Sequence, residues 1–218
     1  MPQFHFLPIF IYIVLQYERY YYLVFVLVRM KLSILESDDK SVRFRLEGTN
    51  FSFANALRRS MINGVGSLAI DKVTFYDNSS AMFDEYIAHR IGLIPITTPK
   101  DYDEKDEVVF SLSAEGPSTV LSKDLVSTSK GVSVANGDIP IIKLVQGQTL
   151  KLDGKAVFGT GMKSSKFQPG LVTYKAVDDS KFEFYVETYG QMTPIEIVRR
   201  ALACISDSLK DVHKEIKK

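Results

Sequence analysis

The C-terminal segment that starts at Thr193 carries the pattern that most constrains the fold. Thr193-Pro194-Ile195-Glu196 combines a capping threonine, a proline suited to the first helical position and a glutamate three residues after the cap, which together form a capping box. The following apolar positions recur at helical spacing: Val198, Ala201, Leu202, Ile205, Leu209, Val212 and Ile216. They predict one amphipathic helix of roughly six turns, whose apolar stripe must be buried against something.

Two surfaces are able to cover that stripe, and the pattern leaves both open. The chain's own sheet alone is one, and the sheet together with a helix of a partner is the other. A sheet is predicted because residues 31–37, 42–48 and 182–189 alternate apolar and polar side chains. Further strands are predicted at 68–76, 108–113, 139–145, 150–163 and 171–176, and residues 115–138 are read mainly as loops.

A second helix is predicted over residues 53–65, after a cap at Asn50 or Ser52. Its apolar stripe contains Phe53, Leu57, Met61 and Val65, and Gly64 and Gly66 end it. Arg58 and Arg59 lie beside the stripe, where they are either solvated or form guanidinium contacts with a partner. Asn55 either satisfies backbone groups near the helix start or contacts that partner.

A short third helix is predicted over residues 82–91. Asp84 and Glu85 lie in its first turn and His89 and Arg90 in its last, which suits the helix dipole at both ends. Gly92 is the predicted C-terminal cap. Dipole-matched surface charge is therefore one interpretation of these four side chains, and a functional contact is the other.

Composition excludes some functions. The 27 basic and 26 acidic residues give a formal net charge of +1, whereas a protein that holds DNA by itself is usually much more basic. Cys204 is the single cysteine, so neither an intrachain disulfide nor a metal site made of cysteines is possible. Its place on the apolar side of the last helix predicts a buried small hydrophobe.

No convincing catalytic, cofactor or metal site emerges from the sequence. The segment Gly159-Thr160-Gly161-Met162-Lys163-Ser164 fails the phosphate-loop pattern, because Met162 separates the glycine from the lysine. The acidic run over residues 101–107 lacks the spacing of a calcium loop. The three histidines are too far apart in sequence to form a metal-ligand pair.

Residues 1–29 differ from the rest because Phe, Tyr, Ile, Leu and Val dominate them. A spanning helix needs about 20 apolar residues, and Gln16, Glu18 and Arg19 interrupt the run. We interpret this segment as a non-native leader or a disordered extension, with Met30 as the natural start. A membrane anchor is the alternative, and the mature N-terminus discriminates between them.

Four runs carry a resemblance to a known family. They are Asn55-Ala56-Leu57-Arg58-Arg59-Ser60, Leu68-Ala69-Ile70-Asp71-Lys72-Val73, Asp77-Asn78-Ser79-Ser80, and Asp84-Glu85-Tyr86-Ile87-Ala88-His89-Arg90-Ile91-Gly92-Leu93-Ile94-Pro95-Ile96. In this order they resemble the D subunit of archaeal DNA-directed RNA polymerase, whose family includes the third-largest subunit of eukaryotic RNA polymerase II and the bacterial alpha subunit. The resemblance covers about residues 30–218.

The resemblance implies an α+β fold. A discontinuous dimerisation domain, a sheet with two helices on one face, would combine residues 30–76 with 168–218. An inserted, mainly-β domain would occupy residues 77–167. The implied function is a non-catalytic assembly scaffold of a cytoplasmic polymerase, which heterodimerises with subunit L, joins subunits N and P, and recruits the second-largest and largest subunits.

The resemblance also implies site residues. Eleven form the expected partner interface: Phe53, Asn55, Leu57, Arg58, Arg59, Met61, Val198, Leu202, Ile205, Leu209 and Val212. Four form the expected large-subunit contact and domain junction: Asp84, Glu85, His89 and Arg90. Many members carry a cysteine-rich insert for an iron–sulfur cluster, which needs several cysteines, so no cluster or other cofactor is expected with Cys204 alone. A free-standing α+β enzyme with an unrecognised site remains the alternative, and it would require a pocket with convergent polar groups.

Overall fold

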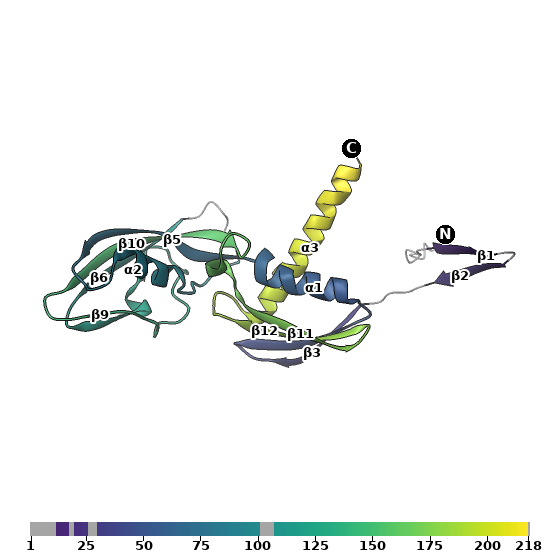
Figure 1. Cartoon of the computed structure of the whole chain (residues 1–218), viewed down its shortest axis with the longest axis horizontal. Coiled ribbons are helices and arrows are strands. Elements are labelled where there is room, and N and C mark those ends of the chain that lie inside the picture. The colour runs from purple at the N-terminus through teal and green to yellow at the C-terminus, as the bar shows by residue number, and fades with distance from the viewer. Residues whose placement is uncertain (1–11, 18–19, 26–29, 101–106, 218) are drawn as a thin grey trace, which may run out of the picture.

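The chain folds into two lobes, each with its own sheet and hydrophobic cluster (Figure 1). The computed structural model describes residues 12–17, 20–25, 30–100 and 107–217. Three α-helices and several antiparallel sheets lie in this part of the chain, so the predicted α+β class is confirmed.

The first lobe is built on a four-stranded antiparallel sheet of order β11-β12-β4-β3. Its strands are β3 (Lys31–Ser37), β4 (Ser41–Glu47), β11 (Gly170–Asp178) and β12 (Lys181–Thr188). Alternation along β4 and β12 buries one face, where the rings of Phe44 and Phe184 stack with centroids 4.9 Å apart. The sheet therefore joins two segments that are far apart in the sequence.

Two helices cover the buried face of this sheet (Figure 1). Helix α1 (Phe51–Arg59) continues into a π-helical turn, η1 (Ser60–Gly64), and helix α3 (Pro194–Ile216) closes the chain. Asn50 caps α1 by accepting a hydrogen bond from the Phe53 amide at 2.9 Å, which confirms one of the two predicted caps. The predicted C-terminal helix is likewise confirmed.

The predicted capping box of α3 forms only in part. The Thr193 hydroxyl accepts from the Glu196 amide at 3.4 Å. The Glu196 carboxylate instead accepts hydrogen bonds from Arg199 at 2.7 Å and Arg200 at 3.2 Å. Two guanidinium partners compete with the single backbone amide that the box offers, and charge-assisted hydrogen bonds are the stronger ones.

The second lobe contains a four-stranded sheet of order β5-β10-β6-β8 and a separate pair, β7-β9. The strands are β5 (Gly66–Asn78), β6 (Val108–Glu115), β7 (Ser118–Leu121), β8 (Val126–Ser127), β9 (Pro140–Leu144) and β10 (Thr149–Thr160). Helix α2 (Asp84–Gly92) packs against β5 and β9 through Ile87 and Ile91, which are fully buried. Two 3-10 turns complete the lobe, η2 (Ser122–Asp124) and η3 (Ser165–Phe167).

Two local expectations differ from the structure, those for Gly92 and for residues 115–138. Residues 66–76 pair with β10, and Leu68 and Ile70 pack in the cluster of the second lobe. Gly92 is the last helical residue rather than the cap, a position that Leu93 occupies. Residues 115–138 contain β7, η2 and β8, because apolar side chains such as Val120 and Leu125 reach the core from this segment. The domain boundaries themselves stay a prediction.

Strands β1 (Tyr12–Tyr17) and β2 (Tyr20–Phe25) form an antiparallel hairpin. The remainder of residues 1–29 lies outside the described part of the chain, so the leader interpretation stays a prediction. Among the described residues, none of the helices has the length and apolar character needed to cross a membrane.

The lobes are joined by hydrogen bonds close to the start of β5. The Leu68 amide donates to the Thr98 hydroxyl at 3.0 Å, and the Thr98 amide donates to the Gln191 carbonyl at 2.8 Å. The Lys166 ammonium lies 2.5 Å from Asp71, and this hydrogen bond lowers the pKa of the Asp71 carboxyl against the opposing effect of burial. These contacts tie the segment after α2, the turn η3 and the segment before α3 to one another.

The solvent-facing side of the first sheet supplies a pH-dependent prediction. Hydrogen bonds from Lys175 and Arg45, at 2.8 and 2.5 Å, lower the pKa of Glu183 from 4.5 to about 2. Because the folded pKa is depressed, this stabilisation is complete above pH 4.5 and lost as pH falls towards 2. Urea unfolding of the protein and of Glu183→Gln should therefore differ at pH 7 and converge near pH 2. An equal difference at both pH values would contradict the assignment.

Candidate protein interface

An apolar groove runs between the edge of the first sheet and the first turns of α3. Its volume is about 230 Å³. Strands β3 and β4 and helix α3 line it with Leu32, Ile34, Val42, Phe44, Ile195, Val198, Arg199 and Leu202. Arg199 is the one charged side chain in this lining, so the groove suits apolar side chains rather than a polar small molecule.

The groove exists because α3 leaves the sheet before it reaches the edge strand. Helix α3 packs against β12 and β4. Leu32 and Ile34 of β3 are register partners of Leu46 and Phe44, yet they are 45% and 56% exposed whereas the β4 residues are buried. The apolar side of an edge strand is thus left open to solvent, a feature that typically marks a protein interaction site.

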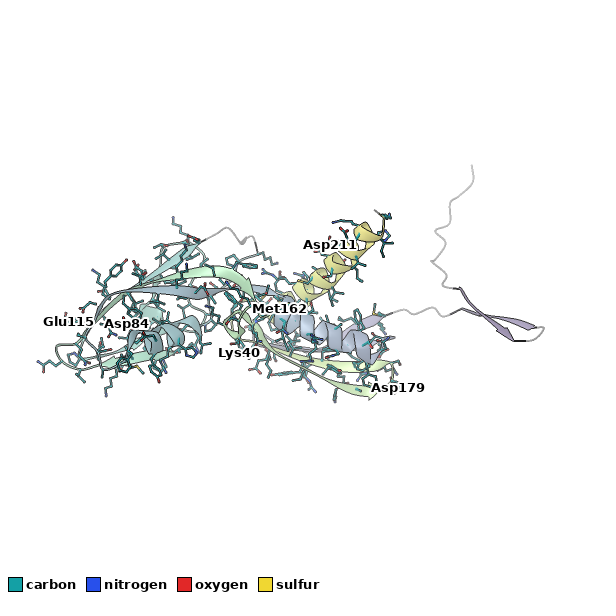
Figure 2. All side chains as sticks on the ribbon, turned by 45° about the horizontal axis from the view of Figure 1, so that its top comes forward. Lys40, Asp84, Glu115, Met162, Asp179 and Asp211 are labelled. Carbon is teal, nitrogen blue, oxygen red and sulfur yellow. The ribbon has the colours of Figure 1, made fainter. Side chains whose placement is uncertain are left out.

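The apolar stripe of α3 extends beyond the groove, along the half of the helix that points away from the first sheet. Val198 and Ala201 are buried, and Ile205 packs in part against the first cluster. Beyond them, Leu209 is 65% and Val212 58% exposed. Figure 1 shows this half of α3 projecting away from both sheets, and Asp211 marks it in Figure 2. Within the part of the chain that the structure describes, only the first half of α3 is covered.

Charges beside the exposed stripe are neutralised within the helix. Lys210 lies 2.9 Å from Asp207, and Lys214 lies 3.0 Å from Asp211, each pair three residues apart. Such exposed pairs add little stability. These pairs leave the side chains beside the stripe with little net charge. A partner would therefore contact this half of α3 mainly through apolar side chains.

Glu196 anchors the base of α3. Burial raises the pKa of this carboxyl, but the hydrogen bond from Arg200 and the charges of Lys100 and Arg199 outweigh that effect and hold the pKa below its ordinary value. Arg200 also donates to the Pro99 carbonyl at 3.4 Å. The first turn of α3 is thereby held to the segment that follows α2, which fixes one wall of the groove.

The predicted interface residues of α1 fall into two groups. Leu57 and Met61 are fully buried in the chain's own core, and Phe53 packs against it. These three side chains therefore fix α1 and η1 to the sheet and are not open to a partner. Arg59 is exposed and makes no ion pair within the described residues, while Arg58 donates to the Asn55 side chain at 3.0 Å. The structure thus brings Arg59 to the surface of α1, away from the groove lining.

The four polar residues of α2 lie on the surface of the second lobe, where Figure 2 labels Asp84. Asp84 accepts a hydrogen bond from the Asn78 side chain at 2.6 Å. Arg90 donates to the Ile141 and Pro140 carbonyls at 2.9 and 2.5 Å. The hydrogen bonds that join the lobes come from other residues, among them Thr98 and Gln191.

A shallow hollow of about 610 Å³ lies on the open face of the second sheet. Tyr76 and Asp153 line it, with a hydrogen bond of 2.9 Å between them. That bond raises the pKa of Tyr76, while hydrogen bonds from Ser111 and Tyr76 lower the pKa of Asp153. The pKa values of both groups are thus shifted away from pH 7, whereas a general acid or base works best with a pKa near the pH of the reaction.

Metal-binding chemistry does not emerge either. Within the residues that the structure describes, no cluster of three or more His, Cys, Asp or Glu side chains could hold a metal ion. Cys204 is half-buried rather than fully buried, its Sγ lies 3.5 Å from the Gly64 carbonyl, and burial raises the pKa of its thiol. The expectation of no cofactor stays a prediction.

Sequence reasoning missed the sheet wall of the groove. Leu32 and Ile34 were assigned to a half-buried strand, because alternation reports which face a side chain shares and not whether that face is covered. Ile195 was also missed as a lining residue of the groove, because its segment was interpreted only as the capping box of the helix. Alternation does not report which strand lies at an edge, because that depends on the order of pairing in the sheet.

The open edge of the first sheet and the half-covered helix α3 are typical of a protein that pairs with another chain. Residues 43–209 match the family described as the RNA polymerase Rpb3/Rpb11 dimerisation domain, and the chain belongs to this family.

Several curated relatives are named DNA-directed RNA polymerase subunit Rpo3. The chain is 46% identical to that of Pyrococcus furiosus over 153 residues, which are 67% of this chain and 59% of the relative. It is 42% identical to that of Methanocaldococcus jannaschii over 165 residues, 76% of this chain and 85% of the relative. The Natronomonas pharaonis protein is 43% identical over 141 residues. The chain thus spans about three fifths of the Pyrococcus relative.

The half-covered helix leads to a prediction for the free chain. An isolated helical segment of this length is marginal in water, so the amides of residues 207–216 should open locally and exchange at least about tenfold faster than those of 197–201. Hydrogen–deuterium exchange read by mass spectrometry measures both. Equal protection of the two segments would show that the distal half is covered within this chain.

Proposed function

We propose that this chain is a non-catalytic assembly subunit of a DNA-directed RNA polymerase, in which the groove and the stripe of α3 pair with a second subunit. The observation that carries the proposal is the set of apolar side chains in the groove and along α3, from Leu32 to Val212, that the described residues leave exposed. Membership in a dimerisation family supports the same function. RNA synthesis would then take place on other chains of a cytoplasmic complex.

Subunit L is the proposed occupant of the groove, through an apolar helix that lies along α3. The stretch from Leu202 to Ile216 contains fifteen residues, or about 22 Å of helix, so about four turns of a partner helix would cover it. Apolar burial of this kind stabilises an association by about 25 cal/mol per Å² before the cost of association is counted.

Subunits N and P and the two large subunits are the further proposed partners. Arg59 of α1 is exposed and unpaired within the described residues, and a planar guanidinium suits a bidentate contact with a carboxylate of another chain. It lies apart from the groove, so the chain would be able to hold two partners at once. Asp84 and His89 on α2 offer polar contacts on the other lobe.

The pairing prediction uses the distal half of α3, since substitutions there leave the core intact. Leu209→Asp with Val212→Asp should weaken binding of subunit L at least about 100-fold, because two apolar side chains that the pairing would bury become charges. Val126→Asp is the control, since Val126 is also exposed, at 66%, but lies on the second lobe. Isothermal titration with purified subunit L measures both variants, and unchanged affinity in the double variant would refute the proposed interface.

A second prediction tests the α1 surface. Arg59→Glu should leave subunit L bound and reduce recovery of the second-largest subunit by about tenfold. The substitution replaces an attractive charge pair at the interface by a repulsive one, which costs roughly 1.4 kcal/mol or more. Lys130→Glu is the control, since Lys130 is also exposed and makes no ion pair within the described residues, but lies on the second lobe, away from the groove. Native purification with quantitative mass spectrometry provides the readout, and full recovery of the large subunit would exclude a role of Arg59.

A further inference from the structure

The π-helical turn η1 meets α3 at the point where that helix becomes exposed. Among the described elements, none contacts α3 more extensively than η1. The contact falls on Ala201, which is buried, and on Cys204, which is half-buried. From position 206 to position 217 every residue is exposed. Within the described part of the chain, η1 is therefore the last support of α3 before the helix leaves the first lobe.

Two side-chain hydrogen bonds tie η1 to α3. The Ser60 hydroxyl donates to the Ala201 carbonyl at 2.9 Å, and the Cys204 thiol, a weak donor, lies 3.5 Å from the Gly64 carbonyl. Each of these bonds ends on a main-chain carbonyl of the other element, so the contact constrains the two backbones directly. The Val65 amide donates to the Ser60 carbonyl at 3.1 Å, and this i→i+5 bond closes the π turn.

The crossing of η1 and α3 depends on small side chains. A Cβ atom added at Gly64 would lie 3.2 Å from the Ser60 Oγ and 3.9 Å from the Cys204 Cβ. The distance between packed helices is set by the side chains at their contact, and here Ser60, Gly64, Ala201 and Cys204 are all small. The direction of α3 is thus fixed by close backbone approach at a single crossing.

The turn after β10 holds η1 from another side. A Cβ atom added at Gly161 would lie 2.5 Å from the Ile62 carbonyl oxygen and 3.0 Å from the Asn63 Cα, so only glycine fits there without a shift of η1. The Met162 amide donates to the Asn63 carbonyl at 3.3 Å. Figure 2 shows Met162 where the two lobes meet. The longest contact strand of the second lobe therefore ends against the turn that supports α3.

We propose that η1 is the pivot that sets the direction in which α3 leaves the first lobe, and that Ser60, Gly64 and Gly161 are positioning residues for the pairing surface. They act through the backbone of α3 rather than through contact with the partner. The inference rests on the proposed function, because one partner helix can contact the groove and the exposed stripe together only if α3 has the right direction.

The length of the exposed half makes the pairing sensitive to this pivot. That half is about 22 Å long, so a tilt of about 10° at η1 displaces its end by about 4 Å. Apolar side chains are in contact only within about 4.5 Å, so such a tilt removes contacts at the end of the stripe. A surface that already has its binding geometry avoids the cost of ordering on association.

Pulsed electron paramagnetic resonance on the free full-length chain tests the pivot. Spin labels are attached through p-azidophenylalanine at Lys210 on α3 and at Thr173, which is exposed on β11, so that Cys204 is not modified. Gly161→Ala should shift the mean distance between the labels by about 4 Å. Ser60→Ala should widen the distance distribution at least about 1.5-fold, because α3 loses a hydrogen bond at the crossing.

Two further variants separate positioning from a general loss of a hydroxyl group. Ser60→Thr keeps the donor and should restore the narrow distribution. Ser208→Ala is the matched control, since the Ser208 hydroxyl also donates to an α3 carbonyl at 2.9 Å, but to that of Cys204 within the same helix. It should leave the distances unchanged. Equal distributions in the unmodified chain, Ser60→Ala and Gly161→Ala would overturn the inference.

Binding of purified subunit L, measured by isothermal titration, gives the second readout. Ser60→Ala and Gly161→Ala should each weaken binding at least about fivefold, and Ser60→Thr should bind as the unmodified chain does. Altered distances with unchanged affinity would refute a positioning role. If Gly161→Ala fails to fold, the two Ser60 variants decide the question. Failure of the unmodified chain to bind subunit L would instead refute the proposed function, and the distances in the free chain do not depend on that result.

Discussion

Helix α3 extends beyond the surface on which the described residues bury it. This difference in length underlies both the exposed half of the helix and the open groove of the first lobe. Its buried part ends near Ala201, after about 12 Å, and about 22 Å of amphipathic helix follows. An apolar stripe in water is unfavourable, and an isolated helix of that length is marginal. The same departure of α3 from the sheet opens β3 and creates the groove.

The two lobes divide the proposed work of the chain between two surfaces. The first lobe offers an apolar groove whose flanking charges are paired within the chain, a combination suited to helix packing. The second lobe offers the exposed polar side chains of α2, Asp84 and His89 among them, which suit polar contacts with a further partner. Hydrogen bonds through Thr98 and Gln191 connect the lobes, so both surfaces belong to one scaffold.

Much of the fold was predictable, because local patterns act over short distances. The strands from Lys31 to Glu47, the Asn50 cap and the start of α3 follow from alternation and capping chemistry. Leu209 and Val212 were predicted at the interface, and the structure leaves both exposed. The pairing of residues 66–76 with β10 was not predictable, since strand pairing is a long-range choice.

The sequence by itself determined which face of each element is apolar, because side-chain periodicity is a local property of the chain. It also shows a single cysteine, Cys204, from which the prediction of no iron–sulfur cluster follows. Only the tertiary structure decided which apolar faces stay uncovered: it buried Leu57 and Met61, and it exposed Leu32 and Leu209. Burial depends on what packs against a face, and that is settled by the arrangement of all the elements at once.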